Sequence, residues 1–272
     1  MNSMAVDDRP YVGPRHRWRT GWLAGLLAEA LAERTAAGSP NQAEARNLPQ
    51  PVLLDLGCGD GTVALELAAR GFPVLACDLD TGRLRRLAAR SRERGLASRV
   101  HLFCADAQAL PLAAGCLAGA ACGEVLEHLA QDRDTLAALR ASLTPEAPLV
   151  LSVPAGPRRL GPVDRAIGHH RRYDEAGLRS LLAGAGFDIT LLRPWGFPFG
   201  RLYDRWVQEP ILMDSAPARR RLWARLGRAA VVDRFFRLLF NLDRPLSRLA
   251  PESGSGWMAS ARSGLQRPSS NA

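Results

Sequence analysis

The sequence contains no lysine, so all 36 of its basic residues are arginine, against 27 acidic residues and a net charge of +9. A functional demand for cations would not exclude lysine from every surface position. We therefore interpret its absence mainly as a bias in coding composition. The excess of positive charge favours acidic partners such as nucleic acid, anionic lipid or phosphate, without choosing between them.

Cysteine is scarce and never forms a C-x-x-C pair, which argues against a zinc site, and we expect no metal. The five cysteines lie between residues 58 and 122, in apolar stretches of the kind that form strands. Their odd number and apolar surroundings predict reduced thiols that are buried as small hydrophobic side chains.

Long apolar runs and a secretory leader are also missing. The longest apolar run, residues 109–123, is too short and too rich in glycine and alanine to span a bilayer. The N-terminus carries Asp7, Asp8 and Arg9 and has no apolar segment of the signal-peptide kind. A cytoplasmic location is therefore the default expectation.

What the sequence does contain is an alternation of two patterns. With 272 residues, 47% apolar and 23% charged, the chain is long enough for a soluble globular protein. From residue 52, short apolar runs alternate with helical segments, which predicts an α/β fold with a doubly wound parallel sheet. Strands are expected at 52–56, 73–79, 99–105, 117–123, 147–154, 187–194 and 255–261, and helices at 18–37, 61–70, 81–95, 132–143 and 174–185.

This alternation divides the chain into five parts. We expect an N-terminal helix and linker in 1–50, the α/β core in 51–194, a basic helical insertion in 195–252, a last core strand in 253–262 and a disordered tail in 263–272. The residues available for an apolar helix face in the insertion are Leu222, Leu226, Phe236, Leu239 and Phe240.

A glycine-rich turn follows the first strand of the core. Gly57, Gly59 and Gly61 come after Asp55 in the pattern D-x-G-x-G-x-G, and glycine lets the backbone approach a ligand closely. A dinucleotide-binding turn reads G-x-G-x-x-G, whereas here the third glycine comes one residue early. The alternative is a turn that binds no ligand.

Two aspartates at later strand ends extend this candidate site, because ligands of doubly wound sheets bind at the carboxyl ends of the strands. Asp78 ends the second strand, where a carboxylate can accept hydrogen bonds from ribose hydroxyls. Asp80 is better placed to cap the next helix. Asp106 ends the third strand and could face an adenine amine, with Ala107 offering a backbone N–H. Each aspartate alone could be no more than a helix cap.

These segments resemble class I S-adenosylmethionine-dependent methyltransferases. "VLLDLGCGDG" (52–61) is similar to their glycine-rich motif, "ACDLD" (76–80) to the acidic second-strand motif, "CADAQALPL" (104–112) to the adenine-contacting motif and "GEVLEHL" (123–129) to the fourth-strand motif. The fourth strand itself departs from the family, because it lacks the acidic residue that is common there. Within the class, D-x-x-x-G-H-x-R-R-Y (164–173) resembles the type 11 group, close to the ubiquinone-biosynthesis O-methyltransferases.

The resemblance implies a Rossmann-like sheet with six parallel strands, an antiparallel seventh strand and S-adenosyl-L-methionine as cofactor. It also implies methyl transfer by in-line displacement to a hydroxyl or amine of a small-molecule, glycan or lipid-precursor acceptor. The cofactor-binding residues it implies are Asp55, Gly57, Cys58, Gly59, Gly61, Asp78, Leu79, Asp106, Ala107 and Glu124.

A second polar cluster, "GHHRRY" at 168–173, follows the fifth strand and is expected at the same edge of the sheet. Histidine is the usual proton acceptor near neutral pH, and arginine can hold an anionic group through two hydrogen bonds. The alternative is a structural lid whose arginines pair with local carboxylates, with His128 as a helix cap or loop support. The catalytic candidates are His128, His169 and Tyr173, and the substrate-binding candidates are Asp164, Arg171 and Arg172.

The basic insertion leaves several roles open. It could roof an acceptor pocket for a small-molecule or lipid-linked substrate, pack as a helical subdomain, or rest on an acidic membrane surface through 217–249. The last role would make the protein membrane-peripheral. The sequence predicts no oligomeric state.

Three other functions compete with methyl transfer to a small molecule. A non-catalytic S-adenosylmethionine-binding scaffold or partner subunit would share the cofactor motifs. An NAD-dependent oxidoreductase would share the fold class but not the glycine spacing. A nucleic-acid methyltransferase would suit the charge, but its Asn/Asp-Pro-Pro-aromatic motif would stand where this chain has "EVLEHL", so no nucleic-acid partner is expected.

Overall fold

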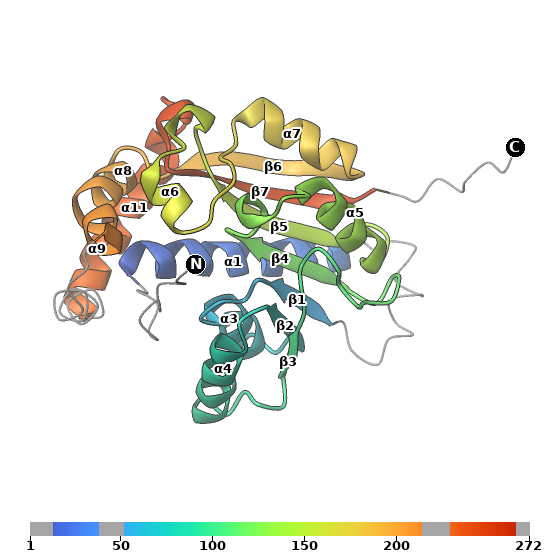
Figure 1. The fold of residues 1–272 in the computed structure, drawn as a ribbon. Helices are drawn as coiled ribbons and strands as arrows, with labels where there is room; N and C mark the ends of the chain where they lie inside the picture. Colours follow the sequence, from blue (N-terminus) through green and yellow to red (C-terminus); the bar gives the residue numbers. More distant parts are fainter. Residues whose placement is uncertain (1–12, 38–51, 214–228, 265–272) are drawn as a thin grey trace, which may run out of the picture.

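The centre of the molecule is a seven-stranded sheet. Its strands are β1 (Leu53–Leu56), β2 (Val74–Asp78), β3 (Val100–Cys104), β4 (Gly119–Gly123), β5 (Pro148–Pro154), β6 (Phe187–Trp195) and β7 (Gly256–Ser263). In this computed structural model, which describes residues 13–37, 52–213 and 229–264, they lie in the order β3-β2-β1-β4-β5-β7-β6 (Figure 1). Neighbours from β3 to β5 are parallel, and β7 is antiparallel to both β5 and β6. The predicted doubly wound, Rossmann-like sheet is therefore confirmed.

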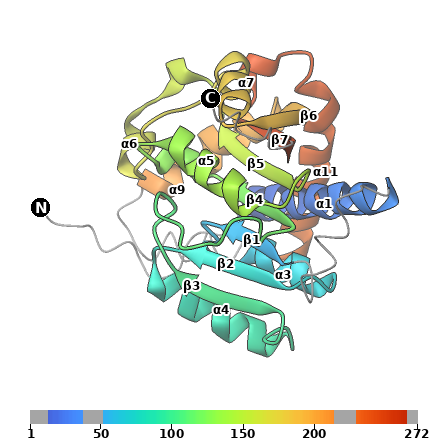
Figure 2. The ribbon, with the colours of Figure 1, turned by 90° about the vertical axis from the view of Figure 1, so that its right-hand side faces the viewer.

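Helices cover both faces of this sheet. They are α1 (Pro14–Ala36), α3 (Thr62–Ala69), α4 (Thr81–Glu93), α5 (Asp132–Ser142), α6 (Pro162–Ala166), α7 (Glu175–Gly184), α8 (Phe199–Tyr203), α9 (Glu209–Met213) and α11 (Ala230–Leu246). One apolar cluster joins the sheet to α5 and α7, and a second joins it to α1, α3 and α4. Figure 2 shows the strands from β3 at the bottom to β6 at the top, with α1 and α5 on opposite sides. Every residue of β1 and β5 is buried, as apolar strands covered on both faces require.

Helix α1 begins earlier than the predicted start at residue 18. Its first residue is Pro14, and proline suits a first helical turn because its missing N–H would have no intrahelical partner there. Trp18, Leu23 and Leu27 are buried in the cluster shared with the sheet and α3. The helix is therefore part of the α/β sandwich.

The segment between β6 and β7 forms a helical cap at one end of the sheet. Figure 1 shows α8, α9 and α11 gathered there beside α6. A π-helical turn at Asp204–Gln208 joins α8 to α9. Asp243 in α11 is buried and accepts the N–H groups of Phe199 (2.8 Å) and Gly200 (2.7 Å), so it anchors α11 to the start of α8.

Several expectations need adjustment. Of the residues predicted for the apolar face of the insertion, Phe240 is buried, whereas 222 and 226 lie outside the described residues, as do most of the predicted linker and tail. The five cysteines are all unpaired, but Cys104 is exposed because it ends the edge strand β3. Within the described ranges, no helix combines the length and the apolar character that crossing a membrane needs.

Candidate active site

The glycine-rich loop joins β1 to α3 and contains three left-handed residues. Gly57, Gly59 and Gly61 have φ of +64°, +52° and +75°. A Cβ on Gly57 would collide with Val125, and one on Gly61 would collide with Leu87. Glycine is therefore needed at these two positions both for the backbone conformation and for the close approach of neighbouring side chains.

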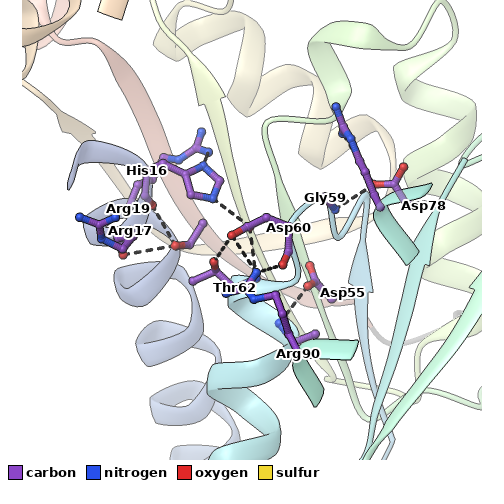
Figure 3. A network of polar contacts seen from close by, with 12 residues as sticks. His16, Arg17, Arg19, Asp55, Gly59, Asp60, Thr62, Asp78 and Arg90 are labelled. Atoms are coloured by element: carbon purple, nitrogen blue, oxygen red, sulfur yellow. Dashed lines mark hydrogen bonds and ion pairs between the residues drawn. The ribbon is translucent and has the colours of Figure 1, made fainter. Parts of the chain in front are cut away.

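Asp78 ties the end of β2 to this loop (Figure 3). One carboxylate oxygen accepts the N–H of Gly59 (2.8 Å), and the other accepts the N–H of Asp80 (2.9 Å). Each oxygen has a further lone pair, so Asp78 can still accept hydrogen bonds from ligand hydroxyls. Asp80 caps α4 by accepting the N–H groups of Gly82 and Arg83, the role that the sequence predicts for it.

Two residues predicted to bind the cofactor turn their side chains into the protein instead. Asp55 is buried and accepts the N–H of Ala64 in the first turn of α3 (2.9 Å), and burial raises its pKa to about 8. Cys58 is also buried, which raises the pKa of its thiol, and its backbone N–H donates to the carbonyl of Cys77 (2.8 Å). Both side chains support the loop from inside and present no polar group to a ligand.

The remaining predicted cofactor residues form a row along the edge of the sheet. Asp106 is exposed at the end of β3, Ala107 beside it is half-buried, and Leu79 after β2 is 69% exposed. Because β3, β2, β1 and β4 are neighbours, Asp106, Asp78, the glycine loop and Glu124 follow one another in space. An exposed leucine between carboxylates suits a ligand with an apolar face and a polar rim. We call this set the cofactor row.

The first turns of α1 contact the glycine loop (Figure 3). His16 Nε2 donates to Asp60 (3.1 Å), which also accepts from the Thr62 hydroxyl (2.6 Å) and pairs with Arg90 (3.2 Å). Burial opposes ionisation of Asp60, but these partners outweigh it and hold its pKa below the usual range. Burial also lowers the pKa of His16, so the ring is neutral and its Nδ1 can accept from Arg19 (3.5 Å).

Glu124, directly after β4, has an unusual backbone. Its φ is +57°, a region that costs a non-glycine residue about 1–3 kcal/mol. Its carboxylate lies 2.7 Å from the guanidinium of Arg19, and its N–H donates to the carbonyl of Ser152 (2.8 Å). Burial, together with the neighbouring Arg15, lowers the pKa of Arg19 to about 9. The strained residue is thus held by α1 and β5 together.

The histidine that follows β5 is held by a buried carboxylate. Asp164 in α6 accepts hydrogen bonds from His169 Nδ1, Arg172 Nε and the Gly161 N–H, each at 2.9 Å. Burial opposes ionisation of Asp164, but these donors keep its pKa below the usual value. An ionised carboxylate only accepts, so His169 carries its proton on Nδ1 and has a lone pair on Nε2. Burial, and then His128, lowers the pKa of His169 to about 4, so the ring is neutral.

Two further groups lie near Nε2 of His169. Glu127 is fully buried, which raises its pKa to about 8, and its carboxylate is 3.8 Å from that nitrogen. Among the described residues, neither Glu127 oxygen has a hydrogen-bond partner. His128 uses Nδ1 to donate to the carbonyl of Gly168 (3.2 Å), and its ring meets that of His169 edge to face, with centroids 4.6 Å apart.

These three side chains could also hold a metal. One potential ligand atom from each of Glu127, His128 and His169 lies within 4.8 Å of the other two. Both histidines use Nδ1 for a hydrogen bond, which leaves Nε2 available on each ring. Two imidazole nitrogens and one carboxylate suit a divalent cation such as Fe²⁺ or Zn²⁺. This arrangement was not expected from the sequence, which predicts no metal.

The other members of the predicted polar cluster lie elsewhere. Tyr173 is buried and donates its hydroxyl to Asp132 (2.9 Å), and burial together with this carboxylate raises the phenol pKa. Arg171 pairs with the same carboxylate (2.9 Å) and donates to the carbonyl of Ala130 (2.8 Å). Both side chains are therefore occupied at the start of α5. The structure does not bring either of them to His169, so the arrangement gives no support to a catalytic Tyr173 or a substrate-binding Arg171.

A cavity of about 340 Å³ extends from Glu124 to His169. Its walls come from α1, the ends of β4 and β5, α6 and the cap of α8 and α9. The charges that line the cavity are balanced, because arginines and carboxylates pair there. These pairs are Arg19–Glu124, Arg172–Asp164 and Arg15–Asp204.

Helix α1 is the part of this site that the sequence pattern did not identify. Arg15, His16 and Arg19 line the cavity, although residues 1–50 were expected to form only a helix and a linker. The run "RHRWR" at 15–19 was the available signal, because it places four cationic or titratable side chains within about one helical turn and a half.

One stretch of the chain is similar to a known protein family. Residues 53–146 match the family model of a methyltransferase domain. No curated protein matches the chain. The match to the family model covers every residue of the cofactor row, together with Glu127 and His128.

Solved structures share the fold. A candidate sarcosine dimethylglycine methyltransferase from Galdieria sulphuraria has a TM-score of 0.61 at 14% identity, over 90% of this chain and 84% of its own. Geranyl diphosphate C-methyltransferase from Streptomyces coelicolor was solved with Mg²⁺, geranyl diphosphate and S-adenosyl-L-homocysteine. It has a TM-score of 0.56 at 15% identity, over 82% of this chain and 79% of its own. The [4+2]-cyclase SpnF has a TM-score of 0.57 at 22% identity, over 79% of this chain and 75% of its own. At these identities the likeness shows the fold, which is the Rossmann-like fold of methyltransferases.

Proposed function

We propose that this protein is a class I methyltransferase that uses S-adenosyl-L-methionine to methylate an oxygen or nitrogen of a small-molecule, glycan or lipid-precursor acceptor. The cofactor binds along the cofactor row, and the acceptor binds in the cavity beside it. The observation that carries this proposal is that the row and the cavity meet at Glu124, a residue of the matched stretch 53–146, and that His169 lines the same cavity. The D-x-x-x-G-H-x-R-R-Y pattern supports a place near the ubiquinone-biosynthesis O-methyltransferases.

The geometry suits the chemistry of methyl transfer. The donor is a sulfonium that becomes a neutral thioether, so alignment of donor and acceptor is the main requirement, and it can contribute roughly 7–11 kcal/mol. The acceptor must also lose a proton. Asp164 orients His169 so that Nε2 can take this proton, a contribution of about 10²- to 10⁴-fold in rate. The carboxylate then stabilises the imidazolium, and Arg172 keeps the carboxylate ionised.

The same side chains support a second way to activate the acceptor. A divalent cation held by Glu127, His128 and His169 would lower the pKa of an acceptor hydroxyl that it contacts. Chelation separates the two possibilities. Turnover that survives excess EDTA supports proton transfer to His169, whereas loss of turnover that added Fe²⁺ or Zn²⁺ restores supports the cation.

Calorimetry with the full chain tests the cofactor. We expect S-adenosylmethionine and S-adenosylhomocysteine to bind and NAD not to bind. Asp78→Asn should weaken cofactor binding by about ten-fold or more, because an amide in place of the carboxylate has one acceptor oxygen fewer for ribose hydroxyls. Asp80→Asn is the matched control, since Asp80 caps α4 and should leave the dissociation constant unchanged. Binding of NAD alone would contradict the proposal.

Turnover tests the reaction itself. The protein is incubated with methyl-labelled S-adenosylmethionine and phenols, sugars, lipid extracts and nucleic acids. We expect label in one of the first three. Cofactor binding without label in any acceptor would favour a non-catalytic scaffold, and label in nucleic acid alone would contradict the acceptor class. The test is needed because a [4+2]-cyclase shares the fold.

A further inference from the structure

Helix α11 has an apolar stripe that faces solvent. Val231, Phe235, Leu238 and Leu242 are between 47% and 81% exposed, and Leu249, just after the helix, is 81% exposed. The four helical residues are spaced by four, three and four positions, so they fall within about 60° of the helix circumference. Single exposed apolar residues are ordinary, but a continuous row of them marks a surface that binds something.

The stripe lies opposite the face by which α11 packs on the protein. Phe240 contacts the ring of Trp18 in α1 (centroids 5.7 Å apart), and Asp243 binds the start of α8. Counted around the helix, these two residues stand more than about 80° from every member of the stripe. The stripe is therefore not needed for the packing of α11 within the described structure.

Arginines border the stripe along one side. Arg234 lies beside the stripe, Arg237 and Arg244 lie further round the same side of the helix, and Arg248 lies in the turn just after the helix, each of them exposed. Arg237 pairs with Asp233 (2.6 Å), and Arg244 lies over the ring of Trp22 (4.5 Å). In the part of the chain that the structure describes, Arg234 and Arg248 have no ion pair with a carboxylate. The flank therefore offers positive charge that the fold itself does not use.

We propose that the exposed face of α11 docks on the surface of an anionic lipid bilayer, with the stripe among the acyl chains and the arginine flank at the headgroups. A helix with an apolar side and a basic flank has the chemistry of an interfacial membrane helix. This inference is independent of the proposed methyl transfer.

Other occupants fit the face less well. A second copy bound antiparallel through the same face would bring the two arginine flanks together, which like-charge repulsion disfavours, and a copy bound parallel would leave both flanks without an anionic partner. A nucleic acid would pair with the arginines but leave the leucines and the phenylalanine in water. Only a surface that is both apolar and anionic satisfies the two halves of the face.

Vesicle co-sedimentation with the full chain tests the proposal. The probes are vesicles of phosphatidylcholine alone and vesicles that contain phosphatidylglycerol. We expect binding to the anionic vesicles that weakens as salt rises, and little binding to the neutral ones. Phe235→Ser combined with Leu238→Ser should weaken binding by about ten-fold or more, because two apolar side chains no longer enter the bilayer.

The arginine flank has a matched control on another helix. Arg234→Gln combined with Arg248→Gln should weaken binding to the anionic vesicles by about ten- to thirty-fold. Arg85→Gln combined with Arg92→Gln removes the same charge from exposed positions of α4 and should change binding by less than about two-fold if docking is local to α11. Circular dichroism checks that each variant is folded.

Three results would overturn the proposal. One is the absence of vesicle binding by the folded wild type. Another is an equal loss of binding in the α4 and α11 arginine variants, which would indicate attraction by net charge. The third is a dimer in sedimentation velocity that the Phe235→Ser and Leu238→Ser changes dissociate, which would assign the stripe to a second copy.

Discussion

The cofactor row and the neighbouring cavity are built in different ways, although they meet at Glu124. The row presents backbone N–H groups and single carboxylates at the ends of neighbouring strands. The cavity is made from arginine–carboxylate pairs that come from separate segments of the chain, such as Arg19–Glu124 and Arg172–Asp164. A change in the row should therefore affect one hydrogen bond, whereas a change in the cavity leaves a buried charge without its partner.

The largest expected effect lies on the cavity side. His169→Asn should lower turnover by about 10²- to 10⁴-fold and leave the cofactor dissociation constant within about two-fold, because in the proposed mechanism Nε2 acts on the acceptor and not on the cofactor. His170→Asn is the matched control, since the neighbouring ring is exposed. Steady-state kinetics and calorimetry measure the two quantities. An equal loss of turnover in both variants would show that the cluster is a structural lid.

The next effect compares ion pairs in the two regions. Arg19→Met should lower the free energy of unfolding by about 3–5 kcal/mol, because it leaves the Glu124 carboxylate largely buried without its partner. Adding Glu124→Gln should restore part of the loss. Arg83→Gln removes an exposed ion pair beside Asp78 in the row and should cost about 1 kcal/mol or less. Urea denaturation measures the free energy of unfolding of all three variants. Equal losses for Arg19→Met and Arg83→Gln would show that ion pairs in the cavity and in the cofactor row do not differ in this way.

A third prediction uses Asp55 in β1 and Asp60 in the glycine loop, whose pKa values move in opposite directions. The folded pKa of Asp55 is raised to about 8 from 3.8, so its contribution to stability is lost as pH rises between these values. The folded pKa of Asp60 is lowered, so its contribution is present above about pH 4 and is lost on acidification. Asp55→Asn should flatten the free energy of unfolding between pH 5 and 8, and Asp60→Asn should flatten it only below about pH 4. Denaturation curves of both variants between about pH 2 and 8 measure this. Flattening below about pH 4 in Asp55→Asn, or between about pH 5 and 8 in Asp60→Asn, would contradict the prediction.

The smallest effect is expected at Tyr173. Its hydroxyl binds Asp132 away from the cavity, so Tyr173→Phe should cost about 1 kcal/mol of stability and change turnover by less than about two-fold. Thermal denaturation and steady-state kinetics measure these. A loss of turnover as large as that of His169→Asn would support a catalytic role for Tyr173.

The cofactor row was largely predictable because it is encoded in short, local patterns. Strand periodicity located the strand ends, glycine spacing identified the turn, and Asp80 follows the pattern of a helix cap. What local patterns do not encode is the direction of a side chain. Asp55 belongs to the glycine motif, but its carboxylate faces Ala64 inside the protein.

The cavity was less predictable because long-range contacts assemble it. "GHHRRY" contains five ionisable side chains, yet His169 faces Asp164 while Arg171 and Tyr173 face Asp132. The sequence of this segment does not indicate which side chain points to Asp164 and which to Asp132, because these carboxylates come from two different helices, α6 and α5. The role of α1 was missed for the same reason, because its partner Asp60 lies 44 residues further along the chain.

The contacts of α1 have a consequence for the order in which the protein can mature during synthesis. Arg17 pairs with Asp233, 216 residues later, and Arg15 pairs with Asp204, 189 residues after it. Helix α1 is therefore synthesised at least 189 residues before the carboxylates that pair with Arg15 and Arg17. Because contacts this far apart in sequence form late, we expect the parallel strands to assemble first and the contacts of α1 to form only after α11 has been synthesised.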